Sequence, residues 1–336
     1  MPSVAGPIPV RPAIWTPGTP SRASSTAPRA CATRTFDFLP AELLNVDLRA
    51  IARFIDWTFF FSAWELKGRF PEILDDPKYG AAARDLYENA QAMLARIFDG
   101  ARLRADGVHA FHPANSIGDD IVLWTDESRS EELARLPMLR QQSDQHDDKP
   151  NRSLADYIAP LESGRVDWIG SFALCGGVGA EAFAKEFQDA RDDYSSILVK
   201  ALADRLAEAF AEWLHLRVRK EWSYGVDEDL SKQELIRERY RGIRPAFGYP
   251  ACPDHTPKRT LFRVLEADKV GMRLTESCAM IPAASVSGLY LASPHARYFS
   301  IGRIGRDQVE DYGRRAGLSV AETEHWLGPH LAYDPS

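Results

Sequence analysis

The longest amphipathic pattern in the chain runs from about Asp192 to Lys220. Its apolar residues recur almost every four positions, which places them on one face of a helix. These residues are Tyr194, Leu198, Leu202, Leu206, Phe210 and Trp213. Shorter patterns of the same period predict a helix from Asp47, another from about Gly80 to Phe98, and one or two short helices within Asp307–Leu327.

Shorter apolar runs between these patterns are typical of strands. Asp167–Cys175 is the best of them, and Gly107–Phe111 and Asp120–Trp124 also read as strands between turn residues. Ala283–Leu291 is small and apolar, and Tyr298–Ile304 looks like a further strand. Because helices and strands mix without a βαβ repeat, the pattern predicts an α+β fold rather than a doubly wound sheet.

Other segments break these patterns. His112–Asn115 is predicted to be a proline-stiffened loop between two strands, and residues 126–152 a polar, exposed excursion. Residues 1–35 are rich in Pro, Ala, Ser and Thr and contain no Asp or Glu. That composition predicts a disordered leader or linker. A transit peptide has similar chemistry, but the prolines would spoil its amphipathic helix.

Composition narrows the class of protein. The 336 residues are 45% hydrophobic and 26% charged, as in an ordinary globular protein. The net charge of −7 gives no reason to expect nucleic acid as a partner. The four cysteines form no Cys-x-x-Cys pair, which argues against a zinc site or disulfide framework and fits a reducing cytoplasm. No apolar run approaches the ~18 residues needed to span a membrane.

Residues 241–256 hold the chain's densest cluster of conformationally special residues, with three prolines and two glycines. Prolines fix φ and lack an N–H donor, so this segment is expected to be a stiff, irregular loop. Arg244 supplies a fork suited to a carboxylate, and Gly248 lets backbone come close to a ligand. The loop is therefore either a recognition site or a rigid surface connection.

A glycine cluster, Gly176–Ala180, follows the best strand and precedes a helix. A dinucleotide site would also require an acid about 20 residues later, at the end of a second strand. Here that distance falls within the long helix, at Lys200. A simple glycine turn is the better interpretation.

Acidic residues on the long helix lie in a row with Lys200 at i,i+4 spacing. They are Asp204, Glu208 and Glu212, and Glu238 shortly precedes the proline-rich loop. The row is either a solvated face or an acidic wall beside a cationic ligand. Asp56, which follows Ile55 and precedes Trp57, is either a capping or core-paired carboxylate or a contact for an ammonium group.

The histidines form no His-Glu-x-x-His pattern, and no Ser-His-Asp set can be assembled. We therefore predict neither a metal site nor a catalytic residue within this chain.

Several motifs together resemble the C-terminal activation domain of cobalamin-dependent methionine synthase. The strongest is Arg244–Thr256. The others are Asp56–Thr58, Trp64–Pro71, Pro113–Asn115, Gly118–Asp120, Lys200–Phe210, Leu274–Ser277, Ala284–Gly288, Asp307–Tyr312 and Trp326–Pro329. They run in family order, so residues 36–336 are expected to form this activation domain.

The resemblance implies a C-shaped single domain, with a twisted antiparallel sheet and flanking helices, that binds S-adenosylmethionine without a Rossmann fold. It implies reductive reactivation: a flavodoxin-type donor supplies an electron, and S-adenosylmethionine supplies the methyl that restores methylcobalamin. The Asp-x-His-x-x-Gly motif of the cobalamin module is absent. Cobalamin is thus expected on a partner module, and the chain is either a subunit acting in trans or part of a longer enzyme. The alternative is a non-catalytic S-adenosylmethionine sensor or docking scaffold.

The resemblance also places cofactor contacts at Asp56, Arg244, Tyr298 and Phe299. We expect Arg244 to pair with the carboxylate and Asp56 with the ammonium group. Tyr298 and Phe299 would hold the adenosine end by backbone contacts or ring packing. Gly248 and Tyr249 would shape the wall near the sulfonium. A possible outer acidic set consists of Asp204, Glu208 and Glu238.

Basic residues near the loop give a possible docking patch for an acidic flavodoxin, with a solvated face as the alternative. They are Arg217, Arg219, Lys220, Arg237, Arg239 and Arg241.

Overall fold

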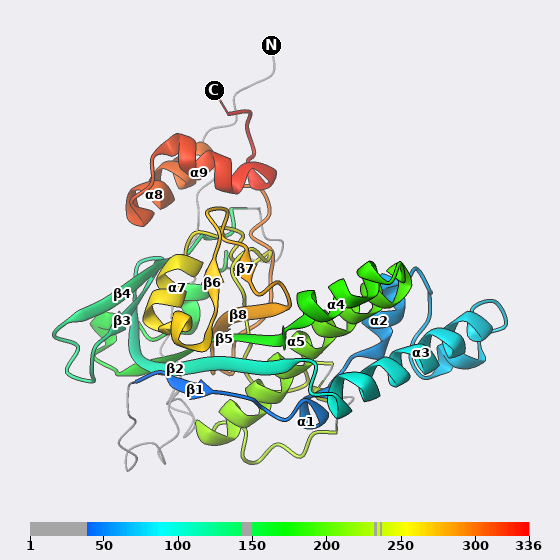
Figure 1. Cartoon of the computed structure of the whole chain (residues 1–336). Helices are drawn as coiled ribbons and strands as arrows, with labels where there is room; N and C mark the ends of the chain where they lie inside the picture. The colour runs from blue at the N-terminus through cyan, green and yellow to red at the C-terminus, as the bar shows by residue number, and fades with distance from the viewer. Residues whose placement is uncertain (1–38, 143–149, 232–233, 236, 336) are drawn as a thin grey trace.

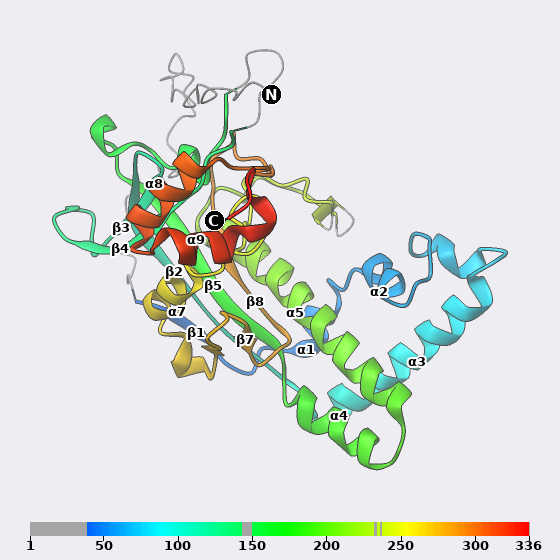
Figure 2. The same cartoon turned by 90° about the horizontal axis from the view of Figure 1, so that it is seen from above.

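A computed structural model describes residues 39–142, 150–231, 234–235 and 237–335. The predicted leader, residues 1–35, lies outside the described residues, as does the 143–149 part of the predicted excursion. The described chain folds into an antiparallel sheet with helices packed on both of its faces (Figures 1 and 2). The α+β class is confirmed.

Within the described residues, six strands form the main sheet in the order β4-β3-β2-β5-β8, with β1 also paired to β2. Every pairing is antiparallel. The strands are β1 (Ala41–Leu43), β2 (Arg104–Ile117), β3 (Asp120–Trp124), β4 (Glu132–Pro137), β5 (Asp167–Val178) and β8 (Ser285–Tyr290). A small separate sheet pairs β6 (Arg273–Leu274) with β7 (Met280–Ile281).

The described α-helices are α1 (Leu48–Ala52), α2 (Trp57–Ala63), α3 (Gly80–Asp99), α4 (Ala180–Asp189), α5 (Asp193–Glu221), α7 (Lys258–Val264), α8 (Arg306–Ala316) and α9 (Val320–Leu327). Short 3-10 helices are η2 (Glu72–Asp75), η4 (Leu154–Tyr157), η5 (Leu161–Ser163), η6 (Ala267–Val270) and η7 (Gly328–His330). The predictions of α3, α5 and two C-terminal helices are confirmed.

Strand β5 separates two hydrophobic cores, because alternate side chains of a strand point to opposite faces. Trp168, Phe172 and Leu174 join the core that also contains residues of α3, α4 and α5. Ile169 and Ala173 join the core formed with α7. A strand buried on both faces is apolar along most of its length, which explains why the sequence pattern of β5 is so clear.

The glycine cluster after β5 serves close packing as well as a turn. A Cβ on Gly176 would lie 2.4 Å from the backbone nitrogen of Ala207, and one on Gly177 would lie 2.8 Å from the Cβ of Ala203. Both contacts bring α5 directly onto the sheet. Only Gly179, with φ of 96°, lies at the turn into α4. The antiparallel pairing of β5 differs from the parallel arrangement of a dinucleotide site.

The predicted local structure was wrong for two segments and incomplete for a third, residues 126–152. His112–Asn115 is part of β2, where Pro113 lies opposite Trp168 of β5. On its other edge, Pro113 falls between the stretches paired with β1 and β3, so the sheet tolerates a residue without an N–H there. The described residues 298–304 belong to no strand: only Ile304 makes an isolated bridge, and Gly302 has a φ of 73°.

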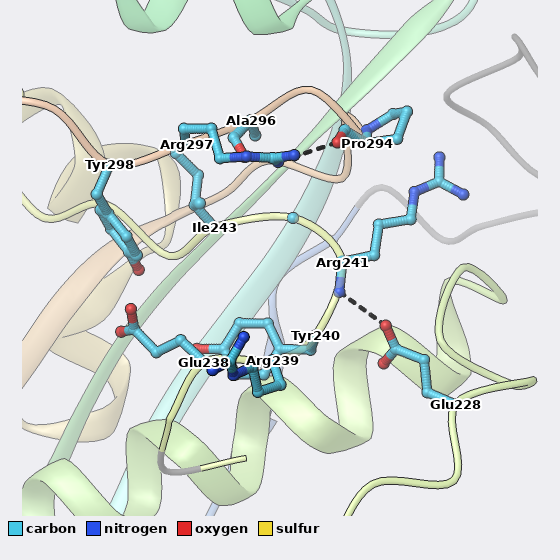
Figure 3. A pocket seen from close by; sticks show the side chains of 11 residues that line it. Glu228, Glu238, Arg239, Tyr240, Arg241, Ile243, Pro294, Ala296, Arg297 and Tyr298 are labelled. Carbon is cyan, nitrogen blue, oxygen red and sulfur yellow. Dashed lines mark hydrogen bonds between the residues drawn. The ribbon is translucent and has the colours of Figure 1, made fainter. Parts of the chain in front are cut away.

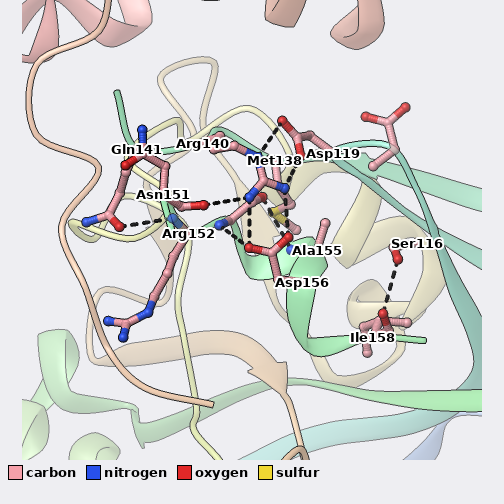
Figure 4. Close-up of polar contacts among 12 residues, drawn as sticks. Ser116, Asp119, Met138, Arg140, Gln141, Asn151, Arg152, Ala155, Asp156 and Ile158 are labelled. Atoms are coloured by element: carbon pink, nitrogen blue, oxygen red, sulfur yellow. Dashed lines mark hydrogen bonds and ion pairs between the residues drawn. The ribbon is translucent and has the colours of Figure 1, made fainter. Parts of the chain in front are cut away.

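The charged segment 126–152 is not simply an exposed excursion, because it contains β4 and the buried residue Arg140. Arg140 lies between two carboxylates (Figure 4): its Nη1 and Nη2 donate to Asp156 at 2.8 and 2.7 Å, and its Nε donates to Asp119 at 3.0 Å. Its backbone N–H donates to the side chain of Gln308 on α8 at 2.6 Å. Charge pairing thus lets a polar segment pack beneath the C-terminal helices.

Candidate functional site

The proline-rich loop 241–256 is irregular, as predicted, and is fixed to the end of β8. Ile243 forms an isolated bridge with Leu291, and the N–H of Leu289 donates to the carbonyl of Pro245 at 2.9 Å. Phe247 and Cys252 anchor the far side of the loop in the core around α7. Arg244 is therefore mounted on a backbone held from both sides.

The side chain of Arg244 reaches α5 and is only 14% exposed. Its Nη1 lies 3.1 Å from Oε2 of Glu212, and 3.4 Å from both the carbonyl of Ala211 and Nδ1 of His215. Among the residues that the structure describes, Nε and Nη2 of Arg244 have no hydrogen-bond partner. One edge of the guanidinium is thus held by α5, and the other edge has the geometry to bind a carboxylate.

The charged groups around Arg244 shift one another's pKa values. Burial opposes the charge on its guanidinium, but the carboxylate of Glu212 keeps the pKa above its ordinary value. Burial, reinforced by the cations of Arg244 and Arg219, holds the pKa of His215 well below its usual range. His215 is therefore neutral near pH 7. Burial raises the pKa of Glu238, against the opposing effect of Arg244.

A pocket of about 580 Å³ opens beside this loop, lined by residues of the segments 238–243 and 294–298 together with Glu228. In it Glu238 and Tyr298 point toward one another (Figure 3). The hydroxyl of Tyr298 accepts from the backbone N–H of Arg244 at 2.9 Å, and burial raises its pKa to about 12. The pocket therefore places an acid and an aromatic ring next to the arginine loop.

Glu208 approaches the same loop from α5. Burial is the main cause of the raised pKa of Tyr249, and the negative charge of Glu208 adds to it. Tyr249 as a whole residue is 59% exposed. The structure thus brings together several of the sequence-predicted site residues: Arg244, Gly248 and Tyr249 on one loop, with Glu208, Glu238 and Tyr298 around it.

Within the described residues, no hydrogen bond or ion pair joins the remaining predicted residues to Arg244. Asp56 caps α2, with its Oδ1 accepting from the backbone N–H groups of Thr58 at 2.9 Å and Phe59 at 3.4 Å. The ring of Phe299 packs inward on Tyr157, with centroids 6.4 Å apart. Burial raises the pKa of Asp204, whose charged neighbours are Arg205 and Glu181. Their ligand roles stay predictions.

Sequence reasoning missed the buried set beneath Arg244. His215 stacks on Tyr290, with centroids 5.0 Å apart, and meets the edge of Tyr240 at 4.7 Å. The sequence pattern groups Glu212 only with the acidic row of α5. Its i,i+3 spacing from His215 puts both on one helical face, which is a signal that could have linked them.

The prediction of a six-residue basic docking patch is wrong for Arg219. Arg219 is only 1% exposed: its Nε lies 3.1 Å from Glu228, and its guanidinium lies 4.2 Å from the ring centroid of Tyr240. Arg217 pairs with Glu221 along α5 at 2.6 Å. Arg219 is therefore a structural residue and cannot contact a docking protein.

In the part of the chain that the structure describes, no helix is both long enough and apolar enough to cross a membrane. Across the same described ranges, no group of three or more His, Cys, Asp or Glu side chains is arranged to hold a metal ion.

Comparisons with known proteins agree with this fold. The family described as "Vitamin B12 dependent methionine synthase, activation domain" matches residues 47–317. A solved structure, "Crystal Structure of the MetH Reactivation Domain bound to AdoHcy", is 49% identical, with a TM-score of 0.85. The match covers 88% of this chain and 91% of that one. The chain belongs to the family of activation domains of vitamin B12-dependent methionine synthase.

Proposed function

We propose that this chain binds S-adenosylmethionine and uses it to return oxidised cobalamin on a methionine synthase module to methylcobalamin. The observation that carries the proposal is Arg244, a rigidly mounted guanidinium with one edge unpaired among the described residues, surrounded by acidic and aromatic side chains. The similar reactivation domain was solved with AdoHcy, the demethylated form of this donor.

The residues around Arg244 suit the charges of S-adenosylmethionine. The Nε–Nη2 edge of Arg244 would bind the carboxylate through two charge-assisted hydrogen bonds. Glu208 and Glu238 would surround the cationic part of the ligand, with Asp204 as an outer member and Asp56 as the partner of the ammonium group. The exposed ring of Tyr249, beside Gly248, would shape the wall near the sulfonium. Tyr298, with the backbone at Phe299, would hold the adenosine end.

The protein's contribution to the chemistry is alignment rather than acid–base catalysis. Cobalamin on a partner module, once reduced by one electron from a flavodoxin-type donor, would supply the nucleophile that accepts the methyl group. S-adenosylmethionine bound to this chain would supply that methyl group, its sulfur would keep the electron pair of the broken bond, and S-adenosylhomocysteine would leave. Because a sulfonium is already an activated leaving group, this chain needs to hold it in line with the acceptor.

We further propose that residues 36–336 form one activation domain, with residues 1–35 as a leader or linker, and that it works in the cytoplasm. Cobalamin would be supplied by a partner module, in trans or within a longer enzyme. The family match over residues 47–317 supports this division.

Calorimetric titration with S-adenosylmethionine tests the site. The wild-type chain should bind the ligand, and Arg244→Ala should weaken binding by at least roughly 30-fold, because a charged pair that anchors a ligand contributes about 2 kcal/mol or more. Equal binding by both proteins would contradict the site. Tight binding without methyl transfer to cobalamin would instead favour the sensor or docking scaffold.

A further inference from the structure

Glu212 is a buried carboxylate whose only ion pair within the described residues is with Arg244. It lies on α5 and is 7% exposed, and the nearby helix residues Ala211 and Leu214 are also buried. Its Oε2 faces Nη1 of Arg244 at 3.1 Å, while its Oε1 is buried without a hydrogen-bond partner among the described residues. A buried charge is costly unless it is paired, so the placement of Glu212 depends on Arg244.

The surroundings of this pair fix the direction of the guanidinium. His215 is fully buried, and its Nδ1 lies 3.4 Å from Nη1 of Arg244. The imidazole is itself held between Tyr290 and Tyr240. The carbonyl of Ala211 is a third acceptor, at 3.4 Å. Among the described residues, the hydrogen-bond contacts of the Arg244 side chain therefore all converge on one nitrogen, Nη1, and leave the opposite edge for a ligand.

We infer that Glu212 is a positioning residue for ligand recognition: it holds Nη1 of Arg244 so that the Nε–Nη2 edge meets the carboxylate of the ligand's amino-acid part. This inference rests on the proposed function, because it assumes that Arg244 binds the carboxylate of S-adenosylmethionine. Glu212 acts through Arg244, so its effect is confined to ligands that carry a carboxylate.

The contrary expectation is that Glu212 weakens ligand binding, because its carboxylate competes with the ligand's carboxylate for Arg244. The geometry favours positioning, because Glu212 occupies Nη1 while the bidentate edge has no partner among the described residues. A guanidinium fixed before the ligand arrives loses less conformational freedom on binding. Without Glu212, Arg244 would lose the one ion pair that it makes among the described residues, and it would reorient toward solvent.

The test compares two ligands, S-adenosylhomocysteine and 5′-methylthioadenosine, which lacks the amino-acid carboxylate. Binding of each is measured by calorimetry for the wild-type chain, Glu212→Ala, Glu212→Gln, Arg244→Ala and the double variant. Glu212→Gln retains an oxygen that can face Nη1. It therefore replaces the alanine variant in the comparison where the alanine variant folds poorly. The matched control is Glu221→Ala, which removes another arginine-paired carboxylate from the same helix.

Glu212→Ala should weaken binding of S-adenosylhomocysteine by roughly 30-fold, and Glu212→Gln by less, as expected for one partner of a buried charge pair. Binding of 5′-methylthioadenosine should change by less than about threefold. In the Arg244→Ala background, Glu212→Ala should have no further effect, because interacting residues are not additive. Glu221→Ala should leave both affinities unchanged.

Equal losses for the two ligands, additive losses in the double variant, or tighter binding of S-adenosylhomocysteine by Glu212→Ala would each overturn the inference while leaving the proposed function intact. Failure of the wild-type chain to bind S-adenosylhomocysteine at all would overturn both.

Discussion

Gly248 and His255 pack so closely that no side chain fits between them. A Cβ on Gly248 would lie 2.1 Å from Cε1 of His255, and Gly248 has a φ of 95°. The imidazole is held in turn by Nζ of Lys258, which donates to its Nδ1 at 2.9 Å. The loop that carries Arg244 is therefore closed against the start of α7 by a contact that only glycine permits.

Replacing Gly248 should disturb the loop and weaken ligand binding together. Gly248→Ala adds both backbone strain and a clash, so we expect a loss of about 1–3 kcal/mol in unfolding free energy and at least about tenfold weaker binding of S-adenosylmethionine. Gly271→Ala is the matched control: its φ is 75°, but the space around its Cβ is open. Wild-type binding by Gly248→Ala would contradict the role of this contact.

The buried ion cluster at Arg140 predicts a large effect on stability. Arg140→Ala leaves Asp119 and Asp156 facing each other without their cation, so we expect a loss of about 3–5 kcal/mol. Urea unfolding measures this loss. Arg306→Ala removes an exposed pair with Glu310 and should change the free energy by less than about 1 kcal/mol. Similar values for the two variants would show that the buried cluster contributes no more than a surface pair.

Acid should destabilise the fold before its carboxylates are protonated. Burial lowers the pKa of His112 from 6.5 to about 4, and lowers that of His215 well below its usual range. The unfolded chain therefore takes up protons first, and stability falls as the pH drops below about 6.5. For His112 alone, the loss approaches roughly 3 kcal/mol near pH 4.

Urea unfolding at pH 7, 6 and 5 measures this acid sensitivity. In His112→Leu, the free energy of unfolding should fall less steeply with decreasing pH than in the wild type. The remaining fall should be the part caused by His215. A wild-type unfolding free energy that stays constant from pH 7 to pH 5 would contradict the assignment of buried neutral histidines.

Periodic segments were predictable because their own side chains determine their structure. The apolar face of α5 identifies a helix, and the largely apolar run of β5 identifies a strand, without reference to the rest of the chain. Pro113 was misplaced because its tolerance in β2 depends on which neighbouring strands end beside it. Arg140 was misplaced because its burial depends on Asp119 and Asp156, which lie elsewhere in the sequence.

The same distinction applies to the candidate site. Arg244 and Gly248 stood out because prolines and glycines concentrate around them within a single loop. The positions of Glu212 and His215 beneath Arg244 follow from the packing of α5 on the sheet, which brings residues about 30 positions apart into contact. Local sequence patterns predict the binding loop, but they do not identify Glu212 as the residue that orients Arg244.

The central claim is tested most directly by following the methyl group. This chain would be mixed anaerobically with a cobalamin-loaded methionine synthase core that lacks its own activation domain, a reduced flavodoxin and methyl-labelled S-adenosylmethionine. We predict that the absorbance of cob(II)alamin is replaced by that of labelled methylcobalamin, and that omission of this chain or use of Arg244→Ala prevents the change. Binding of S-adenosylmethionine with no labelled methylcobalamin formed would contradict the account.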